Sequence, residues 1–370
     1  MPTPRLIIAA SEQCPDMLYA TGFFAPDPFL FLEKNGKRMI VLNDLEIDRG
    51  RAQARVDEVI SYSDIAKRLP KSALASFADI VIRFLKEQKV RKAWVPASFP
   101  LGMASELAKA GIALIPQSGL FWKEREFKAD AELKLMRRAL AITEAGLARA
   151  MEVLRATEIK QGKRLQWAGR SLTSEILRAE IDSAVLHAGG QPANTIVAGG
   201  NQACDPHERG SGPLHAHSLI ILDIFPRDAR TGYFGDMTRT VVRGHASEDQ
   251  RRIWETVKQA QTLAIKSMKP GADGGEIHDA VKDFFTLNGY PTGMRDGRQT
   301  GFFHGTGHGL GLEIHEEPRF AKTVFKHGQV ITVEPGLYYP GLGGVRIEDV
   351  VTVTDTGVRM LSKFQKQLEL

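Results

Sequence analysis

The chain has 370 residues, of which 43% are hydrophobic and 25% charged, a composition typical of a globular protein with more than one hydrophobic core and unlike that of a disordered chain. Its 49 lysines and arginines against 44 acidic residues give a net charge of +5, without the dense basic block of a nucleic-acid-binding face. No stretch approaches the roughly 18 apolar residues of a transmembrane helix, so we expect neither a nucleic-acid nor a membrane partner.

The N-terminus contains a short apolar run and one of two cysteines. The run, LIIAA, is too short for the core of a signal peptide. Cys14 and Cys204 lie far apart and form no C-x-x-C metal pair, as in a reduced protein. We therefore expect a cytoplasmic protein.

Residues 1–125 alternate the patterns of strands and helices. Two apolar strands within 29–42 meet at Asn35-Gly36, a dipeptide that favours a tight hairpin turn. Further strands are predicted at 5–10, 92–96 and 112–116, and helices at 77–88 and 104–110. Together these elements predict a small α/β domain.

A long amphipathic helix is predicted from Ala131 onward. Its apolar stripe, which we expect to pack into a core, consists of Leu133, Met136, Leu140, Leu147, Met151 and Leu154. Three further helices are predicted at 171–190, 247–268 and 275–287. The first of these three ends at Gly189-Gly190, a typical helix stop. Strand-rich blocks follow each helix pair, at 219–242 and 330–354.

The two strand-rich blocks resemble each other in layout. In each, an apolar run ends in an acid, and a second acid follows a turn that contains glycine. Asp223 and Asp236 are 13 positions apart, and Glu334 and Glu348 are 14 apart. This similarity between the two halves predicts an internal repeat, in which each copy is made of a helix pair and a β-hairpin.

The position of these four acids beside apolar runs predicts that they are buried. A buried carboxylate is costly unless it is paired, hydrogen-bonded or bound to a cation. If the two hairpins face each other, the four carboxylates converge and call for positive charge between them. Arg346 supplies one unit, and two divalent metal ions would supply four. The matched spacing disfavours the alternative, four unrelated acids in solvated turns.

All ten histidines lie in the second half of the chain, where we therefore expect the chemistry. Three of them occur in FFHGTGHGLGLEIHEEP, residues 302–318. Glycine at every second position from 305 to 311 favours an extended segment, with His304 and His308 on one face about 13 Å apart, too far to share an ion. The zinc motif H-E-x-x-H is absent because Arg319 replaces its second histidine. A Gly-rich loop with surface histidines is the alternative that this stretch alone leaves open.

The candidate ligands occur in the order Asp223, Asp236, His308, Glu334 and Glu348. With the motifs GHGLGLEIHEEP, VEPGLY and RIED, this order resembles the pita-bread metallopeptidase family, which includes aminopeptidase P, prolidase, methionine aminopeptidase and creatinase. The resemblance covers roughly residues 130–370, and LYATGF near the N-terminus is similar to the creatinase-type N-terminal domain. It implies an α+β fold with a pita-bread catalytic domain over 126–370, built as a pseudo-twofold repeat, after a smaller α/β domain over 1–125.

The resemblance implies a centre of two divalent metal ions. Manganese is expected first, with cobalt, zinc or iron as alternatives for this mostly oxygen-donor set. Asp223 would bind one metal ion, and His308 and Glu334 the other. Asp236 and Glu348 would bridge both, and Glu334 would also shuttle protons.

The resemblance also assigns substrate-facing roles. His207, in CDPHERG, would contact the substrate or the leaving group, and His315 would help to stabilise the tetrahedral intermediate. His304 would lie toward the proline side of the substrate, and Arg346 is a further candidate for substrate binding. The glycines around residues 305–311 would let a substrate backbone approach closely. The histidines that match no family position are expected to be ordinary: His215, His217, His245, His278 and His327.

The activity that the resemblance implies is hydrolysis of the N-terminal residue from Xaa-Pro substrates by a hydroxide that bridges the two metal ions. The N-terminal domain and His304 favour aminopeptidase P or prolidase over methionine aminopeptidase, and the choice between longer peptides and dipeptides stays open. A creatinase-like hydrolase of a small non-peptide C–N bond is an alternative, although creatinase dispenses with the metals. A non-catalytic peptide-binding relative is another, but the ligand set is complete. A homodimer is also expected from the family.

One feature departs from the family pattern. The segment between Asp223 and Asp236 is two residues longer than usual, so the turn that contains Pro226 to Arg230 must bulge. Ligation survives if the extra residues stay in this turn. Arg227 and Arg230 then either project near the mouth of the site, where they would favour a substrate carboxylate, or lie exposed on the surface.

Overall fold

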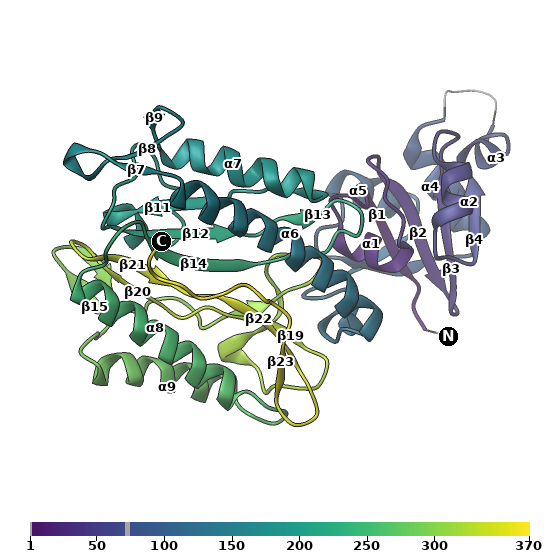
Figure 1. The fold of residues 1–370 in the computed structure, drawn as a ribbon. Helices are drawn as coiled ribbons and strands as arrows, with labels where there is room; N and C mark the ends of the chain where they lie inside the picture. The colour runs from purple at the N-terminus through teal and green to yellow at the C-terminus, as the bar shows by residue number, and fades with distance from the viewer. Residues whose placement is uncertain (1, 71–74) are drawn as a thin grey trace. The chain divides into compact units, whose positions relative to one another are not determined.

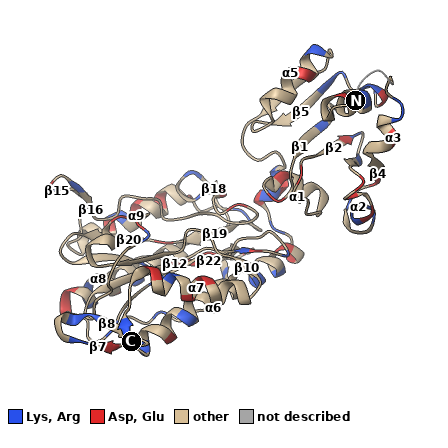
Figure 2. Ribbon diagram, turned by 90° about the horizontal axis from the view of Figure 1, so that it is seen from above, with Lys and Arg blue, Asp and Glu red and all other residues tan. Residues whose placement is uncertain are grey.

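A computed structural model describes residues 2–70 and 75–370 (Figure 1). The chain divides into two compact units, Met1–Arg125 and Glu126–Leu370. Figure 2 shows basic and acidic residues scattered over the elements of both units. No helix within the described ranges combines the length and hydropathy that a membrane span needs.

The first unit is built on a six-stranded mixed sheet of order β4-β3-β2-β1-β5-β6. Its strands are β1 (Arg5–Ala9), β2 (Phe29–Lys34), β3 (Lys37–Leu42), β4 (Glu58–Ser61), β5 (Lys92–Pro96) and β6 (Ala113–Gln117). Its helices are α1 (Pro15–Thr21), α2 (Ile47–Gln53), α3 (Tyr62–Ala66), α4 (Phe77–Glu87) and α5 (Leu101–Lys109). The predicted hairpin is confirmed, since Asn35 (φ 53°) and Gly36 (φ 78°) both take the left-handed conformation that such a turn requires.

The second unit contains two pairs of packed helices. They are α6 (Asp130–Arg155) with α7 (Ser174–His187), and α8 (Glu248–Ser267) with α9 (Gly274–Leu287). The predicted stripe on α6 is buried along its whole length. Figure 1 shows one pair on each side of the strands, so the sheets and the residues that they carry lie between the helix pairs.

The strands of the second unit form two main sheets. One has the order β11-β12-β14, with β11 (Ile196–Gly199), β12 (Leu219–Ile224) and β14 (Met237–Val242). The other has the order β18-β17-β19-β22-β23, with β17 (His308–Gly309), β18 (Glu316–Arg319), β19 (Val330–Val333), β22 (Asp349–Val353) and β23 (Val358–Met360). The hairpin of β20 (Gly336–Tyr339) and β21 (Gly343–Arg346) connects β19 to β22.

Shorter elements complete the second unit. They are β7 (Glu158–Ile159), β8 (Leu165–Trp167), β9 (Arg170–Ser171), β10 (Gly190–Gln191), β13 (Arg227–Asp228), β15 (Gly293–Arg295) and β16 (Arg298–Thr300). The 3-10 turns of the chain are η1 (Lys123–Glu126), η2 (Gln161–Lys163), η3 (Gly200–Cys204) and η4 (Phe320–Lys322). Each helix pair is thus followed by an antiparallel strand pair, β12 with β14 and β19 with β22, which is the repeat that the sequence predicted.

Candidate active site

The two strand pairs position all four acids at equivalent places. Asp223 lies near the end of β12, and Asp236 directly precedes β14. Glu334 directly follows β19, and Glu348 directly precedes β22. Strand ends are held by the ladder on one side only, so side chains there can converge on a shared space.

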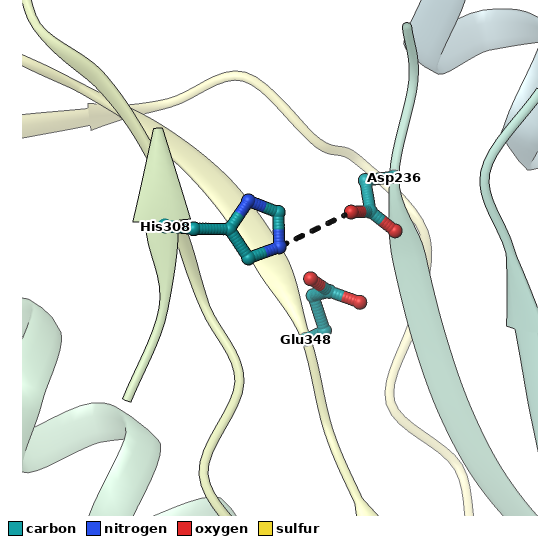
Figure 3. Close-up of side chains that lie close together, drawn as sticks. All are labelled: Asp236, His308 and Glu348. Atoms are coloured by element: carbon teal, nitrogen blue, oxygen red, sulfur yellow. Dashed lines mark ion pairs between the residues drawn. The ribbon is translucent and has the colours of Figure 1, made fainter. Parts of the chain in front are cut away.

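Three of the predicted ligands form one tight cluster. Ligand atoms of Asp236, His308 and Glu348 all lie within 4.8 Å of one another, and all three residues are buried (Figure 3). The Nε2 atom of His308 lies 3.4 Å from Oε1 of Glu334 and 3.7 Å from Oδ2 of Asp236. Four of the five predicted ligands therefore surround one point.

The imidazole of His308 presents a lone pair to these carboxylates. Its Nδ1 lies 3.1 Å from the carbonyl of Gly309 and donates to it, which leaves Nε2 without a proton. Burial, followed by the neighbouring His315, lowers the pKa of His308 to about 3. A neutral nitrogen lone pair that faces carboxylate oxygens is the arrangement of a metal ligand.

The carboxylates raise one another's pKa values. Burial raises the pKa of Asp236 well above its usual range, and the charges of Glu348, Asp223 and Glu334 raise it further. Burial and the charges of Glu334 and Asp223 do the same for Glu348. Burial raises the pKa of Glu334 to about 7, although Arg346 opposes this rise. The site therefore holds more negative charge than its one arginine balances.

Only one of the two carboxylate oxygens of Asp223, the fifth predicted ligand, accepts a hydrogen bond among the described residues. Its Oδ2 accepts a hydrogen bond from Arg346 at 2.7 Å, and its Oδ1 is buried without a hydrogen-bond partner among the described residues. A buried unsatisfied carboxylate oxygen is costly. Together with the lone pair of His308, this oxygen fits a donor set of hard oxygens and one imidazole that binds divalent cations.

Arg346 and His304 belong to one buried network through Tyr338. Arg346 is 4% exposed, and it donates to the hydroxyl of Tyr338 at 2.9 Å as well as to Asp223. Nε2 of His304 accepts from the same hydroxyl at 2.8 Å, since its Nδ1 donates to the carbonyl of Gly305. Burial lowers the pKa of His304 to about 3, so this ring is neutral. The substrate-binding roles of Arg346 and His304 stay predictions.

His315 and His207 lie at the exposed side of the cluster. The ring of His315 meets the ring of His308 edge-on, with centroids 4.4 Å apart. His207 is exposed on the loop after η3. Burial lowers the pKa of His315, and the nearby charges of Arg319 and His207 lower it further. Both histidines thus lie near the cluster, and their substrate roles stay predictions.

Several residues near the site were missed at the sequence level. Tyr338 follows VEPGL directly, a signal that could have identified it. Arg319 was considered only as a missing zinc ligand. His278, expected to be ordinary, lies 2.8 Å from the hydroxyl of Thr306, whose carbonyl accepts from the backbone N–H of Glu334. The contacts of His278 involve residues 28 positions away, which no local pattern reveals.

The predicted extended segment around the glycines at 305–311 is confirmed only in part, and the approach of a substrate backbone to these glycines stays a prediction. Only His308–Gly309 form a strand, and Gly305 is exposed. A Cβ at Gly307 would lie 1.9 Å from the carbonyl oxygen of Thr332, and one at Gly311 would lie 2.3 Å from Oε1 of Glu316. These glycines are therefore needed for close packing of the protein against itself.

The longer turn between the first two acids keeps its extra residues outside the ladder of β12 and β14. β13 pairs with β10, and Oδ2 of the fully buried Asp228 accepts a hydrogen bond from Arg138 at 2.7 Å. The register that pairs Asp223 with Thr238 is intact. Arg227 donates to the carbonyl of Gly232 at 3.1 Å, and Arg230 is exposed.

Comparison with known proteins identifies the architecture. The profile of metallopeptidase family M24 matches residues 134–355. The Xaa-Pro dipeptidase of Pyrococcus furiosus is 34% identical over 250 residues, 66% of this chain and 65% of the relative. That of Pyrococcus horikoshii is 32% identical over 287 residues, 75% of each chain.

A solved structure extends the similarity to almost the whole chain. The Xaa-Pro dipeptidase from Bacillus anthracis is 26% identical and superposes with a TM-score of 0.82, over 99% of this chain and 95% of that one. The pita-bread fold with a preceding α/β unit, predicted from sequence, is thereby confirmed. The chain belongs to metallopeptidase family M24.

Proposed function

We propose that this protein is a metal-dependent peptidase that removes the N-terminal residue from Xaa-Pro substrates, with dipeptides as the first class to test. The observation that carries the proposal is the buried convergence of Asp236, His308 and Glu348, with Glu334 at 3.4 Å from His308. The names of the relatives, Xaa-Pro dipeptidases at 34% and 32% identity, support the substrate class.

The proposed metal centre uses the five residues that the sequence singled out. Asp223, Asp236, His308, Glu334 and Glu348 would hold two divalent cations. Such cations would supply a Lewis acid for the scissile carbonyl and activate the attacking water. The oxygen-rich donor set supports manganese as the first metal, with cobalt, zinc and iron as alternatives.

The chain's own groups supply the proton transfers and the substrate contacts. Glu334, at 3.4 Å from His308, would accept a proton from the attacking water and pass it to the leaving nitrogen. His315 lies beside His308 and would donate a hydrogen bond to the developing oxyanion. His207 would contact the leaving group, and His304 would face the proline, held in place by Tyr338.

The cellular setting is a further part of the proposal. Both cysteines, Cys14 and Cys204, are free, which supports a reducing compartment such as the cytoplasm. A homodimer is proposed from the family resemblance.

The experiment is hydrolysis by metal-stripped protein reloaded with manganese, cobalt or zinc, against matched Xaa-Pro dipeptides, Xaa-Pro-Yaa tripeptides and longer Xaa-Pro peptides. Metal-dependent cleavage is expected, and the preferred length separates a dipeptidase from an aminopeptidase. If protein that binds two ions cleaves none of these, the proposal fails and a small non-peptide C–N bond becomes the substrate to test.

A further inference from the structure

A single glutamine side chain donates hydrogen bonds to the backbone beside two of the proposed ligands. Gln261 belongs to α8 and is fully buried. Its Nε2 donates to the carbonyl of Val333 at 2.8 Å and to the carbonyl of Ile347 at 3.1 Å, and it also lies 3.2 Å from Oδ2 of Asp349. Val333 directly precedes Glu334, and Ile347 directly precedes Glu348.

The hydrogen bonds of Gln261 lie where the ladder between β19 and β22 ends. Val333 and Asp349 form the last rung between β19 and β22, and the chain then leaves the ladder for the β20–β21 hairpin. Beyond that rung the two glutamates are held by different neighbours, since the N–H of Glu334 donates to Thr306 and that of Glu348 donates to Thr238. The amide of Gln261 is the contact that the two backbones share.

Gln261 is a polar residue in an apolar part of its helix. Its Oε1 is buried without a hydrogen-bond partner among the described residues. Its neighbours on the same face of α8, Val257 and Ala264, are fully buried and apolar. The unpaired oxygen is costly, but an apolar side chain of similar volume would leave the buried carbonyls of Val333 and Ile347 without the donor that Gln261 supplies.

We propose that Gln261 is a positioning residue that sets the spacing of Glu334 and Glu348, so that both carboxylates would reach a shared cation. The inference rests on the proposed metal centre. Groups that orient metal ligands from outside the coordination sphere typically account for 10–100-fold in metal affinity. Gln261 acts in this way through the backbone, because it holds the carbonyl before each ligand.

The test is Gln261→Met, which keeps the length of the side chain and removes its donors. Manganese affinity is measured by calorimetric titration of the metal-free protein, and the thermal midpoint of the metal-free protein is measured alongside. The matched control is Gln250→Met on the same helix, because Gln250 also donates to a backbone carbonyl, that of His217, at 3.1 Å. We expect manganese binding about 10–100-fold weaker in Gln261→Met and unchanged in Gln250→Met.

Unchanged manganese affinity in folded Gln261→Met overturns the inference, even if its thermal midpoint falls. If Gln261→Met does not fold, Gln261→Leu keeps an uncharged side chain of similar size and also lacks the amide donors, and the same loss of affinity is expected. A parent protein that binds manganese but cleaves no Xaa-Pro substrate contradicts the proposed function alone. The affinity comparison still decides the role of Gln261 in that case.

Discussion

At the scale of single residues, the site depends on groups whose charge state the fold has shifted. Burial keeps the imidazoles of His308 and His304 neutral. Burial, together with the charge of Asp223, raises the pKa of Glu334 to about 7. Each of these groups can be replaced singly, so its contribution to metal binding, activity or stability can be measured.

His308→Ala removes the single imidazole of the cluster. We expect the protein to fold, to lose most of its bound metal and to lose hydrolysis, because the lone pair that faces Asp236 and Glu334 is gone. Metal analysis after dialysis and circular dichroism check this. His187→Ala, at an exposed position on α7, is the control. Retained turnover in His308→Ala contradicts the proposed centre.

Tyr338→Phe breaks the link between Arg346 and His304. The hydroxyl accepts from the arginine and donates to the imidazole, so its loss frees His304 to turn. We expect kcat/KM for Xaa-Pro substrates to fall about 10-fold or more, while metal content stays near that of the parent. His304→Ala should show the same pattern. Tyr339→Phe is the control, because its hydroxyl donates to Pro291. Equal loss of metal and activity would assign His304 to the metal instead.

The raised pKa of Glu334 makes the stability of the metal-free protein pH-dependent. Burial raises this pKa to about 7, so the contribution of Glu334 is complete below its unfolded-chain value of about 4.3 and is lost as pH rises through 7. Glu334→Gln cannot ionise. The thermal midpoint of Glu334→Gln relative to that of the parent, measured by calorimetry without metal, should therefore rise between about pH 4.3 and 7 and stay level above that range. A difference that does not change with pH contradicts the assignment.

At the scale of elements, local patterns predicted local structure. The Asn35-Gly36 turn and the apolar stripe of α6 are fixed by nearby residues and were predicted correctly. The alternating glycines do not reveal which neighbour they accommodate, because close packing against another segment and an extended conformation favour the same residue. Long-range partners had no local signal, as with Gln261 and Val333, which are 72 positions apart.

The loop that presents His315 is held by a buried ion pair. Lys128, just before α6, lies 2.5 Å from Glu316 of β18, and both side chains are 1% exposed. Removal of one partner from such a pair typically costs about 3–5 kcal/mol, because the other charge is left unpaired.

We therefore expect Lys128→Met to lower the free energy of unfolding by about this amount. The additional change Glu316→Gln should restore part of the loss, since it removes the stranded charge. Urea denaturation measures both variants. Lys160→Met breaks an exposed pair with Glu158 and should change little. If Lys128→Met lowers the free energy of unfolding no more than Lys160→Met does, the ion pair of Lys128 and Glu316 is not strongly coupled.

At the scale of the whole molecule, each compact unit has its own apolar core. Within the second unit, the C-terminal segment contributes directly to the structure behind the site. The buried Arg239 donates to the carbonyl of Glu348, to Asp349, and to the carbonyls of Phe364 and Gln365. One guanidinium thus joins a proposed ligand to the end of the chain.

Deletion of residues 363–370 should therefore affect more than the terminus. Arg239 would lose two partly buried hydrogen bonds, each worth about 1.5–3 kcal/mol for a charged donor. We expect a lower thermal midpoint and weaker metal retention, measured by scanning calorimetry and by metal analysis after exposure to a chelator. Full metal retention in the shortened chain would show that this connection does not reach the site.

The crowding of buried carboxylates has a consequence for how metal enters. Because the pKa values of Asp236, Glu348 and Glu334 are raised, the metal-free pocket stores protons at neutral pH. A cation must displace them, so loading acidifies a weakly buffered solution and apparent affinity rises with pH. The heat of titration will also depend on the ionisation enthalpy of the buffer that takes up the released protons.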